Sequence, residues 1–100
     1  MYIPTEAPEL ADFLGYMILT MPEFTSSMMP DWNADIAFDV LKQGVTKFCK
    51  QGPEAFCRDN MPLIDLAKAE LDKGDEQASY EFLNRMYQNF TDLMRRQNLP

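Results

Sequence analysis

The 100-residue sequence contains no histidine and only two cysteines. Without imidazole, the chain cannot form serine–histidine or cysteine–histidine nucleophile systems, or zinc sites that use histidine ligands. Two thiolates are also too few for a tetrahedral structural zinc site within one chain. Neither GxGxxG nor GxxxxGK[ST], the glycine-rich patterns that bind phosphate, occurs in the sequence. We therefore predict a protein that is not an enzyme and that holds no cofactor and no metal.

Basic residues are missing from the first 41 positions. Residues 42–100 contain nine acidic and nine basic residues, whose charges cancel. The seven acidic residues in residues 1–41 therefore account for the whole net charge of −7. Direct binding of nucleic acid is disfavoured, because it needs clustered Lys and Arg to neutralise phosphates. A basic protein surface is the better electrostatic match for this segment. The alternative is that these acids only complement helix N-termini.

Long apolar runs are absent as well, and glycine is scarce. No stretch is long enough to span a membrane, and the N-terminus MYIPTEAPEL lacks the basic region of a signal peptide. We therefore expect no membrane partner and a cytoplasmic protein. Four glycines are few for an all-β domain, which needs many tight turns.

Hydrophobic periodicity predicts an all-α fold, a small four- to five-helix bundle in a single domain that spans residues 1–100. The most regular stretch is 10–21, where six apolar residues recur at helical spacing: Leu10, Phe13, Leu14, Met17, Ile18 and Met21. Prolines and glycines fall mainly between the periodic segments and delimit them. The predicted helices are 6–21, 33–50, a short one at 54–59, 61–73 and 75–97, with Asn60 as the N-cap of the helix at 61–73.

Cys49 and Cys57 flank Gly52 and Pro53, eight positions apart. This spacing allows a disulfide across the turn. Because a cytosolic setting keeps thiols reduced, we favour two buried free thiols, with the disulfide as the alternative.

The link at residues 22–32, PEFTSSMMPDW, is unusually apolar for a connection between helices. It carries Phe24, Met28, Met29 and Trp32. Either it folds back as a lid on the bundle, or it is an exposed hydrophobic contact. We favour the lid.

The apolar arcs of the helices at 33–50 and 75–97 are wide, and Tyr16 and Leu19 fall off the main stripe of the helix at 6–21. A helix with apolar residues on more than one side has several neighbours or lacks a partner. We therefore expect a homodimer or a partner-bound protein. The predicted partner-binding residues combine an apolar patch with flanking acids: Asp12, Tyr16, Leu19, Met28, Met29, Trp32, Asp35 and Asp39.

These features together favour a non-catalytic regulator of bacterial or phage type that sequesters or inhibits a partner protein, as an inhibitor, anti-activator, immunity protein or chaperone does. The partner would present a basic or apolar surface. The alternative is a structural subunit that assembles with itself through the same surface. A third hypothesis is a small enzyme or metal protein that uses the carboxylates.

Overall fold

Four helices make up the part of the chain that the computed structural model describes, which is residues 3–21, 23–24 and 31–96. They are α1 (Ala7–Thr20), α2 (Ala34–Cys49), α3 (Glu54–Asp72) and α4 (Glu76–Arg96). No strand occurs within these ranges. The predicted all-α bundle is therefore confirmed, with four helices.

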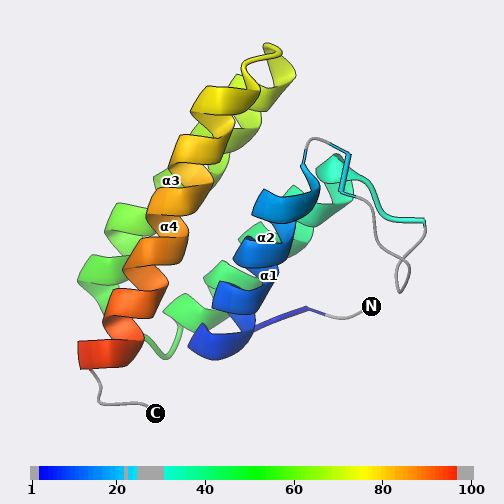
Figure 1. The fold of residues 1–100 in the computed structure, drawn as a ribbon. Coiled ribbons are helices and arrows are strands. Elements are labelled where there is room, and N and C mark those ends of the chain that lie inside the picture. Colours follow the sequence, from blue (N-terminus) through cyan, green and yellow to red (C-terminus); the bar gives the residue numbers. More distant parts are fainter. Residues whose placement is uncertain (1–2, 22, 25–30, 97–100) are drawn as a thin grey trace.

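The four helices form a ring, in which α1 packs along α2 and α4, and α3 packs along the same two helices from the opposite side (Figure 1). Across the ring, α2 also reaches α4, where the ring centroids of Phe48 and Phe90 lie 5.5 Å apart. Figure 1 shows α3 and α4 as a long antiparallel hairpin whose turn projects past the ends of α1 and α2. One hydrophobic core fills the centre of this ring.

The predicted apolar stripe of α1 forms one side of the core. Leu10, Leu14 and Met17 have no exposed surface, and Phe13 has almost none. Opposite them lie the stripes of the other helices, whose larger fully or nearly fully buried members are Phe38, Val40, Leu41, Val45, Ile64, Leu83, Met86 and Phe90. The wide apolar arcs predicted for the second and last helices are thus mostly covered within the chain.

Several helix ends follow from local side-chain chemistry, as expected from the sequence. The Asn33 carboxamide accepts a hydrogen bond from the Ile36 amide at 3.0 Å and caps α2. The Asp75 carboxylate accepts one from the Ala78 amide at 3.0 Å and caps α4. Gly74, between α3 and α4, has a φ of +88°, which glycine adopts without steric cost.

The two helices predicted at 54–59 and 61–73 are a single helix, so this prediction is wrong. Asn60 does not cap a new helix, because its side chain is buried and donates to the Phe56 carbonyl one turn earlier, at 2.8 Å. Pro62 lies inside α3 and has no amide hydrogen to offer the Arg58 carbonyl. Since Arg58 is exposed, water can satisfy that carbonyl, and the helix continues.

The prediction of free thiols is also wrong, because Cys49 and Cys57 form a disulfide with 5.7 Å between their Cα atoms. The last residue of α2 is thereby joined to the first turn of α3. The phenylalanine before each cysteine packs on α4: the ring centroids of Phe48 and Phe56 lie 5.5 and 4.8 Å from that of Phe90. The prediction relied on a reducing compartment. The turn between the two cysteines, however, brings their α-carbons within bridging distance.

Gly44 in α2 allows the backbone of another segment to approach the helix closely. A Cβ at this position would overlap the Pro4 carbonyl oxygen, so the extended lead-in before α1 lies directly on α2. At Gly15 in the middle of α1, by contrast, a Cβ would meet only the Tyr87 ring at 3.5 Å, an ordinary van der Waals distance.

These two glycines predict opposite effects of the same substitution. Each Gly→Ala change removes about 1 kcal/mol of helix-propensity cost. We expect Gly15→Ala to raise the free energy of unfolding by about 0.5–1 kcal/mol. Gly44→Ala should lower it by about 1–3 kcal/mol, because the Pro4 backbone must move. Urea unfolding followed by circular dichroism measures both, and equal effects would show that the lead-in does not pack on α2.

A buried hydroxyl in α4 predicts a stabilising change. Ser79 is 1% exposed, and its Oγ has no hydrogen-bond partner among the residues that the structure describes. We expect Ser79→Ala to raise the free energy of unfolding by about 1–2 kcal/mol, because it removes an unpaired buried hydroxyl and improves helix propensity. Differential scanning calorimetry would show this as a higher Tm. A lower Tm would mean that the hydroxyl is hydrogen-bonded in solution.

Candidate functional site

Three of the predicted partner-binding residues share one exposed face of α1. Asp12, Tyr16 and Leu19 follow each other at helical spacing and all three are exposed. Leu19 keeps 82% of its surface and Tyr16 keeps 38%. The only other large apolar side chain exposed to this degree among the described residues is Leu66 on α3, at 45%. We call Asp12, Tyr16 and Leu19 the α1 face.

Beneath the α1 face lies an aromatic cluster built around Phe24. Its ring stacks on that of Trp32, with the two ring centroids 6.0 Å apart. The centroids of the Phe13 and Tyr16 rings lie 5.9 and 5.5 Å from that of Phe24. Phe24 is fully buried. Tyr16 and Trp32 therefore contact the same ring and belong to one connected unit.

Phe24 holds a backbone conformation that bulky residues rarely adopt, with φ at +54°. This left-handed geometry costs about 1–2 kcal/mol for an L-residue. Burial of a phenylalanine side chain contributes about 1.5–3 kcal/mol, and each aromatic pair adds about 0.5–1.5 kcal/mol. Packing therefore outweighs the strain, and the Phe24 amide still donates to the Thr20 carbonyl at 3.0 Å. The chain turns sharply after α1 so that this ring can enter the core.

The described ends of the link at 22–32 fold back on the bundle. Phe24 is buried, and Trp32 is partly buried and packs against the core. At these two positions the structure agrees with the lid. Met28 and Met29, the other two apolar residues predicted to bind a partner, lie outside the described residues.

Asp35 and Asp39 lie away from the α1 face, on the side of α2 that packs against α3. The Asp35 carboxylate is 2.8 Å from the Lys68 ammonium, which also pairs with Asp72. The hydrogen bonds that the Lys68 ammonium donates to these carboxylates, to Asp35 above all, raise the pKa of Lys68, although partial burial opposes the shift. The Asp39 carboxylate accepts a hydrogen bond from the side-chain carboxamide of Gln43 at 2.8 Å. Among the predicted residues that the structure describes, Asp35 and Asp39 are therefore separate from the α1 face.

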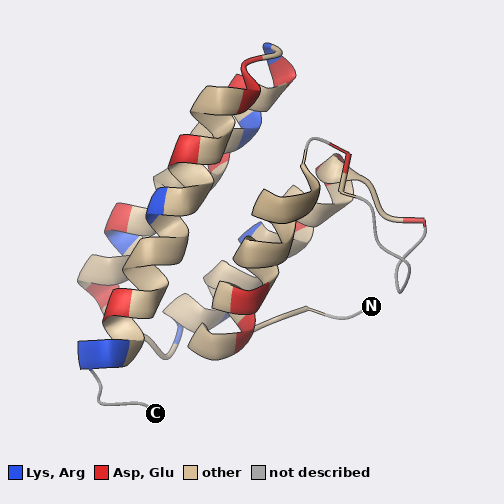
Figure 2. Ribbon diagram, viewed as in Figure 1, with Lys and Arg blue, Asp and Glu red and all other residues tan. Residues whose placement is uncertain are grey.

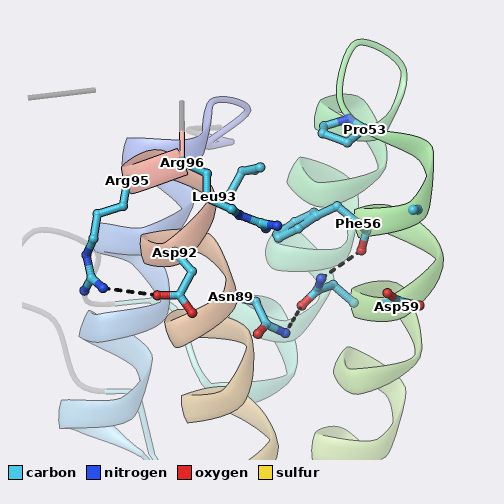
Figure 3. Close-up of a pocket in the computed structure, with 10 residues that line it drawn as sticks. Pro53, Phe56, Asp59, Asn89, Asp92, Leu93, Arg95 and Arg96 are labelled. Atoms are coloured by element: carbon cyan, nitrogen blue, oxygen red, sulfur yellow. Dashed lines mark hydrogen bonds and ion pairs between the residues drawn. The ribbon is translucent and has the colours of Figure 1, made fainter. Parts of the chain in front are cut away.

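A groove of about 800 Å³ opens between the first turns of α3 and the last turns of α4 (Figure 3). Phe56 and Leu93 are among the apolar residues that line it. Deeper in, the buried Asn60 accepts a hydrogen bond from the Asn89 carboxamide at 2.9 Å. In Figure 3 the Arg96 side chain extends from the end of α4 toward Phe56.

Sequence reasoning missed this groove, because it treated Asn60 as a helix cap. The groove carries both signs of charge: Arg95 pairs with Asp92 at 3.3 Å, and Asp59 also lines it. Asn60 and Asn89 are 29 positions apart, and no local pattern indicates that they meet. Within the described ranges, no three cysteine or carboxylate side chains lie close enough to hold a metal ion.

Charge is distributed unevenly over the helices (Figure 2). Helix α1 carries acidic residues and no Lys or Arg, whereas the other three helices carry both signs. Among the described residues, no helix is long and apolar enough to cross a membrane.

Comparison of the chain with protein-family models, with curated proteins and with solved structures finds no match.

The aromatic cluster predicts a coupling between Phe24 and the single tryptophan. Phe24→Ala should lower the free energy of unfolding by about 3–5 kcal/mol, because it leaves a cavity under the α1 face. Phe24→Leu should cost less, since most of the volume stays. In both variants we expect the fluorescence emission of Trp32 to shift to longer wavelength, as its stacked neighbour is lost. An unchanged emission spectrum in a folded Phe24→Leu variant would contradict the cluster.

Proposed function

We propose that this chain is a non-catalytic binding protein that captures a partner protein through the α1 face. The observation that carries the proposal is Leu19, which is 82% exposed beside Tyr16 while the apolar arcs of the bundle are otherwise mostly covered. A leucine left in water on an ordered helix contributes nothing to the fold. Its burial under a partner would contribute about 1.5–3 kcal/mol to binding.

The underlying structure supports a preformed docking surface. Tyr16 packs edge-on against Phe24, which is itself fixed by Phe13 and Trp32. A side chain that is already ordered loses less entropy when a partner binds. Leu19 follows Tyr16 by three positions, so both can contact one apolar strip on a partner.

Electrostatics favour a partner whose apolar strip is flanked by basic residues. Asp12 lies on the α1 face, and no base occurs anywhere in residues 1–41. Opposite charges steer the encounter and set the register, while the apolar contact supplies most of the affinity. The mechanism is occlusion: a regulator of the inhibitor, anti-activator, immunity or chaperone type covers a surface that its partner needs. We place this activity in the cytoplasm.

Self-assembly through the same face is the alternative. In a twofold-symmetric dimer the α1 face would meet a second copy of itself, which brings like charges together around Asp12. This repulsion is the reason that we favour a different, basic partner over a homodimer.

Two exposed leucines provide a matched test. We expect a photo-crosslinking amino acid at Leu19 to form a specific adduct with one protein in the native host, and the same amino acid at Leu66 to form none. With that protein purified, Leu19→Ser should weaken binding by about five- to thirty-fold, equal to about 1–2 kcal/mol. Leu66→Ser, on α3, which lies across the ring of helices from α1, should change affinity less than about twofold. Isothermal titration calorimetry at low and high salt measures these affinities and their electrostatic part.

Leu19 is 82% exposed, so Leu19→Ser should move the free energy of unfolding by no more than about 0.5 kcal/mol. Leu66 is 45% exposed, and Leu66→Ser should lower the free energy of unfolding by about 1 kcal/mol, because about half of the side chain is covered. Loss of binding in Leu19→Ser then reports on the surface and not on folding. Wild-type affinity in a folded Leu19→Ser variant would refute the proposal. Analytical ultracentrifugation that shows a dimer, converted to a monomer by Leu19→Ser, would support the structural subunit instead.

A further inference from the structure

The Cys49–Cys57 disulfide joins two helix ends of opposite polarity. Cys49 is the last residue of α2, and Cys57 lies in the first turn of α3. The two residues also differ in access: Cys57 is 8% exposed and buried in the core cluster, whereas Cys49 is partly exposed. The bond is therefore asymmetric toward an attacking thiol.

We propose that Cys49 is a site of thiol–disulfide exchange with small anionic thiols such as glutathione, and that Cys57 is the leaving group. A nucleophilic thiolate must reach the sulfur it attacks, so Cys49, the more exposed residue of the pair, is the more accessible target. Cys57 belongs to the buried core cluster, which hinders attack on it.

The helix dipoles also favour cleavage in which Cys57 is the leaving group. When the Cys49–Cys57 bond breaks after attack on Cys49, negative charge develops on Cys57 Sγ. The N-terminus of α3 carries a partial positive charge that stabilises this thiolate. The reverse cleavage would place the charge on Cys49, at the C-terminus of α2, where the helix dipole is unfavourable. Burial of Cys57 raises the cost of charge on its sulfur, and Lys47 and Lys50 would lower that cost at Cys49. The proposed direction therefore follows from access and from the two helix ends.

Local charge also suits an anionic reagent, although the chain as a whole is acidic. Residues 40–53 contain three lysines and no acid, although Glu54 follows directly and Glu6 lines a pocket together with Phe48 and Gln51. Two of these lysines, Lys47 and Lys50, flank Cys49 and are exposed, and no ion pair involves them among the described residues. Glutathione has a net negative charge at neutral pH, so this segment attracts it.

The exchange consists of two successive attacks by glutathione thiolates. The glutathione thiolate forms a bond to Cys49 Sγ, the Cys49–Cys57 bond breaks, and its electron pair leaves with Cys57 Sγ, which takes a proton from water. A second glutathione thiolate can then attack the glutathione sulfur of the adduct, releasing oxidised glutathione and the Cys49 thiolate. The sum is one disulfide and two glutathione thiols converted into two protein thiols and one oxidised glutathione. Cytosolic disulfides are commonly transient and of this redox-sensing kind.

Trypsin provides a direct readout, because its sites after Lys47, Lys50 and Arg58 separate the two cysteines into peptides 48–50 and 51–58. The oxidised full-length protein is incubated with millimolar reduced glutathione, quenched with N-ethylmaleimide at early times, digested and analysed by mass spectrometry. We expect the glutathione adduct on Cys49 to exceed that on Cys57 by at least about tenfold. The maleimide label should appear on Cys57 in an amount that matches the glutathione adduct on Cys49.

The control is the same reaction in concentrated guanidinium chloride. There the burial and the helix dipoles are lost, so the ratio of the two adducts should fall to near one. A dominant Cys57 adduct, equal adducts in the folded protein, or a disulfide that millimolar glutathione leaves intact would each overturn the proposal. Reduction without any Cys49 adduct at the earliest times, or a Cys49 preference that persists in guanidinium, would overturn it too.

Discussion

Burial of the apolar stripe of α1 is the contact on which the rest of the structure depends. Helix α1 lies between α2 and α4, while α3 packs on the other side of both, so removal of α1 would open the ring of helices. Leu10, Leu14 and Met17 have no exposed surface in this contact. Because one side of α1 is committed to the core, the opposite side, with Asp12, Tyr16 and Leu19, is held rigidly outward. A stable fold and a presented surface thus come from one helix.

Two aromatic groups secure the ends of this arrangement. Phe24, in its left-handed conformation, closes the turn after α1 and supports Tyr16 from beneath. Phe48 and Phe56 pack on Phe90 and draw the corner between α2 and α3 onto α4, beside the disulfide. Each group joins residues from separate segments. One lies under the proposed docking surface, and the other lies at the disulfide beside the groove.

Much of the candidate site could be predicted from the sequence where helical spacing alone decides it. Asp12, Tyr16 and Leu19 fall on one side of a helix whatever the helix packs against, and the structure places them there. Asp35 and Asp39 could not be assigned in this way, because their surroundings depend on α3, which supplies Lys68 as the ion-pair partner of Asp35. The pairing of Asn60 with Asn89 was equally invisible, since it joins residues 29 positions apart.

By itself, the sequence determined the helical class, most of the helix boundaries and the core stripe of α1, because periodicity, capping residues and prolines act over a few neighbouring positions. It also determined the acidic character of the first 41 residues. Only the tertiary structure decided the rest. It merged two predicted helices into α3, because a buried Asn60 bonds back to Phe56. It joined Cys49 to Cys57 by turning α3 back beside α2, and it buried Phe24 at the cost of backbone strain. These outcomes depend on which distant residues share a neighbourhood, and packing of the whole chain sets that.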